Sequence, residues 1–130
     1  MHLPSVGGMR VANEEISERS ADRQTSCLAA LSHALDDVGI SNLLVRSIRI
    51  TLAHDVPGIA RHLPPELILY GAGGPHRERA KVSVAEAPPG QVFLVHHAGT
   101  GRPRLLSPVH DVEAAVWLLL GSRQGFDPVV

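Results

Sequence analysis

The chain has 130 residues, a net charge of −1 and a hydrophobic share of 44%, which fits one globular domain better than two. A single cysteine excludes an internal disulfide, and no apolar run reaches the roughly 18 residues that a membrane-spanning helix needs. The N-terminus lacks the apolar centre of a signal peptide, so we expect a soluble, cytoplasmic protein. One Trp, one Tyr and two Phe are the only aromatic residues, which disfavours the stacking platforms of single-strand nucleic-acid binders.

A helix is the first element that the sequence predicts, over about residues 23–38. Its apolar residues recur at spacings of three and four and therefore share one face; they are Leu28, Leu31, Leu35 and Val38. Ser20 or Asp22 is suited to cap its start, and Gly39 to end it in a left-handed conformation. Residues 1–22 are polar and poor in large apolar side chains, so we expect a flexible N-terminal segment there.

Extended segments follow the first helix. In the first of them, Ile48 and Ile50 alternate with polar residues, which indicates a strand with one buried face. After it, Asp55 and Pro57 favour one helical turn that Pro64 ends. The predicted strands cover residues 44–53, 66–72, 80–87 and 91–97, with 102–106 as a short hairpin partner of the last.

A second helix is predicted over about residues 108–120, with Ser107 as its N-cap and Pro108 as its first residue. Residues 122–130 are expected to form a tail. Short turns join the strands without helical crossovers, which excludes a doubly wound parallel sheet. We therefore predict an α+β fold over residues 23–121, in which an antiparallel sheet of three to five strands carries both helices on one face.

The apolar face of the second predicted helix is unusually wide. A helix that covers one sheet shows a narrower apolar stripe, so part of this face should contact something else. A second copy of the chain or a protein partner would meet that need, and a lone tryptophan is a favoured interface anchor. The predicted interface residues are Trp117, Leu118 and Val109.

Eight histidines among 130 residues raise the question of a metal site. No pair in a predicted helix has the spacing of three or four that places two ligands on one face. His96 and His97 are neighbours in a predicted strand and point to opposite faces. A composite site from His54, His96 and His110 stays open as an alternative, but scattered surface histidines explain the pattern more simply.

No segment carries a recognisable motif for covalent catalysis or cofactor binding. Cys27 has no identifiable base beside it, so a small apolar residue on a helix is the simpler interpretation. Helix capping explains Ser107. The glycine-rich loops YGAGGPHRER and HAGTGRPR do not feed a helix N-terminus, as a phosphate loop normally does. We therefore predict no catalytic residue, no cofactor and no metal.

The charge is unevenly distributed along the chain. Residues 41–110 hold eight basic and four acidic side chains, whereas the flanking regions are acidic. The basic residues outline an anion-binding patch on the open sheet face and the hairpin tips: Arg49, Arg77, Arg79, Lys81, Arg102 and Arg104. Solvated arginines that face acidic helices are the simpler explanation. Because the whole-chain pI is near 6.7, a nucleic-acid partner is not favoured.

Together these patterns favour a non-catalytic interaction or regulatory domain that acts as a homodimer or with a protein partner. Two alternatives stay open. One is a small enzyme or ligand-binding protein that uses the histidines. The other is an anion or nucleic-acid binder that uses the arginine-rich sheet face.

Overall fold

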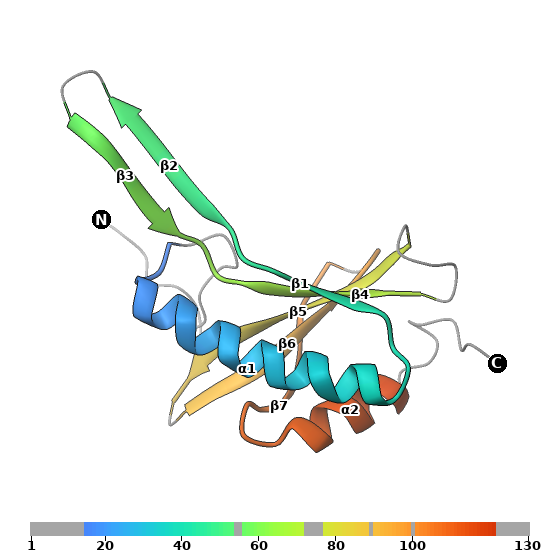
Figure 1. The fold of residues 1–130 in the computed structure, drawn as a ribbon. Coiled ribbons are helices and arrows are strands. Elements are labelled where there is room, and N and C mark those ends of the chain that lie inside the picture. Colours follow the sequence, from blue (N-terminus) through green and yellow to red (C-terminus); the bar gives the residue numbers. More distant parts are fainter. Residues whose placement is uncertain (1–14, 54–55, 72–76, 89, 100, 122–130) are drawn as a thin grey trace.

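The computed structural model describes residues 15–53, 56–71, 77–88, 90–99 and 101–121, and for 51–53 and 56–60 the backbone alone. Helices begin and end this part of the chain, and strands lie between them (Figure 1). In chain order the elements are α1 (Glu18–Asp37), β1 (Asn42–Val45), β2 (Ile48–Ala53), β3 (Val56–His62), β4 (Glu66–Tyr70), β5 (Glu78–Ala87), β6 (Gly90–His97), β7 (Arg104–Pro108) and α2 (Val112–Gly121).

Five strands form an antiparallel sheet in the order β1-β4-β5-β6-β7, and β2 and β3 form a separate two-stranded sheet. Both helices lie on one face of the larger sheet (Figure 1). The helix α1 contacts β1, β4 and β5, whereas α2 contacts β7 and α1. The predicted α+β fold is therefore confirmed, with two helices on an antiparallel sheet of five strands.

The hydrophobic core lies between the two helices and the sheet. Leucines of α1 at spacings of three and four are fully buried, as their periodicity predicts. Alternate residues of β4, β5 and β6 face them, because successive side chains of a strand point to opposite faces. The core residues include Leu28, Leu31, Leu35, Leu67, Leu69, Val82, Val84, Phe93, Val95, Leu106, Val116 and Leu119.

The chain between β1 and β4 forms one long antiparallel ribbon, whose outer half, β2 and β3, projects beyond the sheet (Figure 1). We call this outer half the arm. The two halves meet where the amide of Leu63 donates to the carbonyl of Ser47 at 3.1 Å. Pro64 and Pro65 follow directly, and their missing N–H groups interrupt the ladder.

The arm overturns three expectations. A single strand over 44–53 is wrong, because β1 belongs to the main sheet and β2 to the arm. Ile48 and Ile50, predicted to be buried, are 52% and 63% exposed. Their alternation reports an amphipathic strand, but it does not show that a covering layer exists. The helical turn predicted around Pro57 is also wrong, because that residue lies in β3, on a strand with a single neighbour where proline is tolerated.

The ends of α1 follow local hydrogen-bonding rules. The helix begins earlier than predicted, because Ser17 rather than Ser20 is its N-cap, and the Ser17 side chain accepts from the Ser20 amide at 3.0 Å. At the other end Gly39 has φ of +81°, as the sequence predicts. The amide of Ile40 then donates to the carbonyl of Leu35 at 2.9 Å, which closes the last turn.

The start of α2 differs from the prediction. Ser107 and Pro108 belong to β7, and Ser107 is buried there rather than serving as an N-cap. The side chain of Asp111 instead accepts from the amide of Ala114 at 3.1 Å, so Asp111 has the N-cap role. Ser107 donates to the carbonyl of Asp111 at 3.1 Å and so holds this turn in place. Serine followed by proline therefore marked a strand end rather than a helix start.

Replacing Gly39 tests the left-handed end of α1. Gly39→Ala should lower the free energy of unfolding by about 1 kcal/mol, because φ of +81° is costly for a residue with a Cβ. Urea denaturation of both proteins measures the difference. Gly90→Ala is the matched control, since a Cβ at either glycine meets nothing within 4 Å and Gly90 has no positive φ. Equal effects of the two substitutions would contradict the explanation.

Hydrogen exchange tests the isolation of the arm. The amides of β2 and β3 that pair with each other should exchange faster than those between β5 and β6. The arm strands pair with each other, with one further bridge among the described residues from Ile16 to His62 at the end of β3, and a two-stranded ribbon is at best marginally stable in water. Peptide-level exchange followed by mass spectrometry gives both rates in one sample. Equal protection of the arm and the sheet would show that the arm is not an independent, weakly held ribbon.

Candidate functional site

The outer face of α2 exposes large apolar side chains. Trp117 is 75% exposed and Leu118 is 47% exposed. Val109, the third predicted interface residue, is half-buried and packs against the core. The opposite face of the helix is buried through Ala115, Val116 and Leu119. The helix has 10 residues, and within the described ranges no helix is both long and apolar enough to cross a membrane.

The predicted anion-binding residues do not all lie together, although Arg79 and Lys81 are two residues apart on β5 and so share one face. Arg49 is in β2, Arg77 precedes β5, Arg79 and Lys81 are in β5, Arg102 precedes β7, and Arg104 is in β7. The arm leaves the sheet beside Glu66, whereas β5 begins opposite Tyr70, at the other end of β4. The structure therefore does not join Arg49 to the residues of β5.

The face of the sheet away from the helices is mixed rather than basic. One row across it consists of Leu43, Ile68, Lys81 and His96, which are cross-strand neighbours in succession. Leu43 is exposed, and so is Leu105 on the far edge strand. Lys81 thus lies between Ile68 and His96, and Leu105 pairs with Leu94 further along β6. Arg49, expected on this face, lies on the arm instead.

The described members of the predicted histidine site lie on different elements. His96 is exposed on β6, on the face away from the helices, and His110 is exposed in the turn that leads into α2. His54 lies outside the described residues. Among the residues that the structure describes, no group of three His, Cys, Asp or Glu side chains could hold a metal ion.

His97 lies on the opposite side of β6 from His96, on the face that the helices cover. Partial burial lowers the pKa of His97, and the nearby positive charges of Arg104 and His96 lower it further. The His97 imidazole is therefore protonated at a lower pH than that of an ordinary histidine.

Cys27 lies in α1 and packs partly buried against the core. Burial raises the pKa of the Cys27 thiol, Arg23 opposes this shift, and Glu86 adds to it. The thiol form therefore predominates at neutral pH, which agrees with the interpretation of Cys27 as a small apolar residue.

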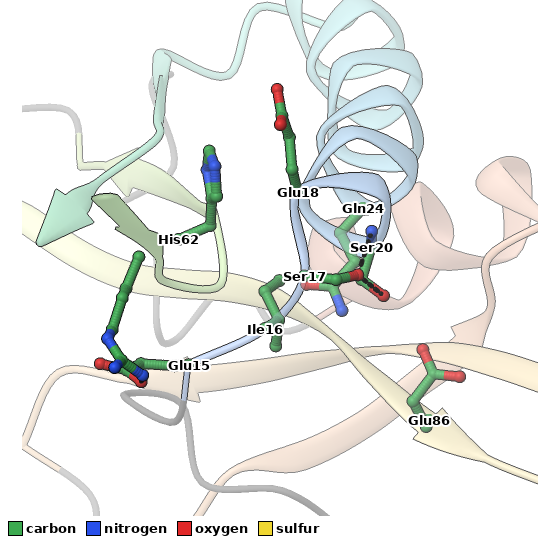
Figure 2. A pocket seen from close by; sticks show the side chains of 9 residues that line it. Glu15, Ile16, Ser17, Glu18, Ser20, Gln24, His62 and Glu86 are labelled. Atoms are coloured by element: carbon green, nitrogen blue, oxygen red, sulfur yellow. Dashed lines mark hydrogen bonds and ion pairs between the residues drawn. The ribbon is translucent and has the colours of Figure 1, made fainter. Parts of the chain in front are cut away.

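A pocket of about 690 Å³ lies between the start of α1, the end of β3 and β5 (Figure 2). The amide of Ile16 donates to the carbonyl of His62 at 2.9 Å and so fixes the segment before α1 against β3. The pocket is lined by Glu15, Ile16, Ser17, Glu18, Ser20, Gln24, Arg61, His62 and Glu86.

Charges and unpaired acceptors dominate this pocket. Arg61 and Glu15 form an ion pair at 3.0 Å, and Arg49 approaches the same carboxylate at 3.6 Å. Two atoms shielded from solvent have no hydrogen-bond partner within the described part of the chain, Oε1 of Gln24 and Nδ1 of His62. A buried amide oxygen without a donor costs about 1–3 kcal/mol, so a donor in this pocket would be favourable.

The sequence did not predict this pocket, because its walls come from three distant segments. A signal was nevertheless present in α1. Gln24 stands four residues before Leu28, on the stripe that otherwise holds buried leucines, and it is only 4% exposed. A buried polar side chain is costly unless it is hydrogen-bonded, so a glutamine on a stripe of buried leucines indicates a polar site at the edge of the core.

Comparison with known proteins finds no relative of this chain. No protein-family model matches it, and neither a curated protein nor a solved structure shows significant similarity.

The lowered pKa of His97 gives a pH test of stability. An unfolded chain protonates this histidine near its ordinary pKa of 6.5, whereas the folded protein does so at lower pH. Stability from this group is therefore complete above that value and falls as the pH decreases from 7.5 toward 5.5. We expect His97→Gln to flatten the slope of unfolding free energy across this range, measured by urea denaturation.

The control for this measurement is His110→Gln, which removes an exposed imidazole from the turn before α2. We expect the slope of unfolding free energy against pH to be flatter for His97→Gln than for His110→Gln. If both follow the wild-type slope, His97 does not contribute to the pH dependence of folding.

Proposed function

We propose that this protein is a non-catalytic interaction domain that associates with a second copy of itself through the outer face of α2. The observation that carries the proposal is the 75% exposure of Trp117, the single tryptophan of the chain. Isolated exposed aliphatic residues are ordinary on protein surfaces, but a large aromatic side chain beside an exposed leucine is a typical interface centre.

The surroundings of Trp117 have the composition of an interface rim. Glu113 lies one turn before it on the same helix side, and His110 and Asp111 lie in the adjoining turn. All three are exposed. An apolar centre within a polar rim is the usual anatomy of a protein interface, because the rim keeps water away from the anchor once the surfaces meet.

A second copy is the partner that this surface suits best. In a two-fold dimer the same patch meets itself, so the two Trp117 side chains and their Leu118 neighbours would pack together across the axis. A net charge of −1 opposes the approach of two copies only weakly. A helix that pairs with its own copy would also supply the contact that the wide apolar face of α2 requires.

The arm supports an interaction role independently. Ile48 and Ile50 are two residues apart on one strand, so both exposed side chains lie on one face of the arm. The arm projects away from the end of the molecule that carries α2 (Figure 1). A dimer formed through α2 would therefore leave both arms free for a further protein partner.

Truncation of the predicted anchor tests this function. We expect the wild-type chain to be dimeric at micromolar concentration, and Trp117→Ala to raise the dissociation constant at least about thirty-fold, as for an interface hot spot. Sedimentation equilibrium measures both constants. The thermal stability of the monomer should change little, because Trp117 is mostly exposed within one chain.

Leu105→Ala is the matched control, because Leu105 is an exposed leucine on the opposite face of the sheet. That variant should dimerise like the wild type. A wild-type chain that stays monomeric up to about 100 μM would rule out self-association as the function of this surface. A dimer insensitive to Trp117→Ala would place the interface elsewhere.

A further inference from the structure

We propose that the pocket at the start of α1 binds a guanidinium group, either that of a small molecule or that of an arginine side chain on another protein. This site is separate from the outer face of α2 and does not depend on self-association. Its case rests on the polar side chains that line the pocket, on their charge and on the shape of the cation that they suit.

Gln24 supplies the first step. The residue is only 4% exposed and lines the pocket, and Figure 2 shows its side chain beside those of Ser17 and Ser20. Its Oε1 has no hydrogen-bond donor within the described residues. The terminal torsion of glutamine has a broad, two-fold preference, so the carboxamide is able to turn its oxygen toward the pocket. A bound N–H donor would satisfy this acceptor.

Two carboxylates supply the second step. Glu18 and Glu86 both line the pocket, from α1 and β5. Glu86 accepts a hydrogen bond from Nε2 of Gln91 at 2.6 Å, which positions its carboxylate without neutralising it. No ion pair to Glu18 or Glu86 is formed by the described residues. Both negative charges are therefore available to a ligand.

The positive groups around the pocket are already engaged. Arg61 is the one arginine in the lining, and it is held by Glu15. The N-terminus of α1 would attract an anion, but the Ser17 side chain caps it and Glu18 stands in its first turn. The lining thus contains three carboxylates and one guanidinium, and this balance favours a cation over a phosphate.

The kinds of acceptor in the lining favour one class of cation. A guanidinium is planar, carries five N–H donors and is weakly hydrated, so it pairs well with a carboxylate and a carbonyl oxygen at once. An ammonium is more strongly hydrated and offers three donors from one point. Nδ1 of His62, also without a partner among described residues, is a further acceptor when the neutral ring carries its proton on Nε2. Ile16 gives an apolar wall for the alkyl chain.

The experiment uses agmatine and N-acetyl-arginine-N-methylamide as probes of the full chain, titrated by calorimetry at low ionic strength. We expect at least one of them to bind at a 1:1 ratio with a dissociation constant in the range of about 10 μM to 1 mM. Binding of agmatine alone assigns the site to a small molecule. Binding of the blocked arginine alone assigns it to a protein side chain, and either result supports the guanidinium site.

Variants connect the binding to the pocket. Glu86→Gln should weaken binding about ten-fold, because it replaces a charge-assisted hydrogen bond by a neutral one. Glu78→Gln is the matched control and should bind like the wild type, because Glu78 is exposed at the other end of β5 and does not line the pocket. Gln24→Leu should abolish binding without lowering the melting temperature, because it removes a buried acceptor that lacks a donor. Loss of binding without loss of thermal stability would identify Gln24 as a ligand contact, because a structural residue would lower both.

Three results would overturn the proposal. The first is no heat of binding and no NMR shift with either probe at millimolar concentration. The second is binding that Glu86→Gln and Glu78→Gln change equally. The third is tighter binding of inorganic phosphate or of cadaverine, whose ammonium ends replace the guanidinium, than of agmatine.

Discussion

The burial of one stripe of α1 against the sheet holds this fold together. Leu28, Leu31 and Leu35 lie on that stripe without solvent exposure, and they pack on the inward residues of β4 and β5. Full burial of a leucine is worth about 1.5–3 kcal/mol, so these residues outweigh any single hydrogen bond in the molecule. The helix α2 completes the layer beside it. The two helices form the layer that covers one face of the sheet, and every surface with a candidate function lies at an edge or on the outside of this layer.

The three candidate surfaces are the pocket, the outer face of α2 and the arm, and each has a different relation to the helical layer. Toward its start, the stripe of α1 changes from leucine to Gln24, and the core gives way to a polar pocket. At α2 the covering helix is apolar on both sides, so its outer face meets solvent through Trp117. At Pro64 and Pro65 the ribbon leaves the sheet, and Ile48 and Ile50 on it are exposed.

Local sequence patterns predicted the helices and most strands of the main sheet, but they failed for the arm, the start of α2 and the pocket. The strands β4 to β7 and both helices were predictable, because period and turn residues report directly on a half-buried element. Ile48 and Ile50 have the same period, yet they are exposed, since alternation cannot show whether a second layer exists. Ser107 and Pro108 resemble a helix start, but pairing with β6 took them into a strand. The pocket is lined by Glu15, Gln24 and Glu86 from three distant segments, and no local pattern brings these together.

The break in the ribbon explains why the arm does not join the sheet. A strand pair that continued through residues 46–65 in register would extend β1 and β4 without changing partner. Prolines at 64 and 65 remove two consecutive donors, so the ladder is carried across this point by the bond from Leu63 to Ser47 alone among the described contacts. The ribbon can then turn away from the twist of the sheet. The same two prolines that cost ladder hydrogen bonds therefore separate the arm from the sheet, and its residues Ile48 and Ile50 are exposed and available to meet another surface.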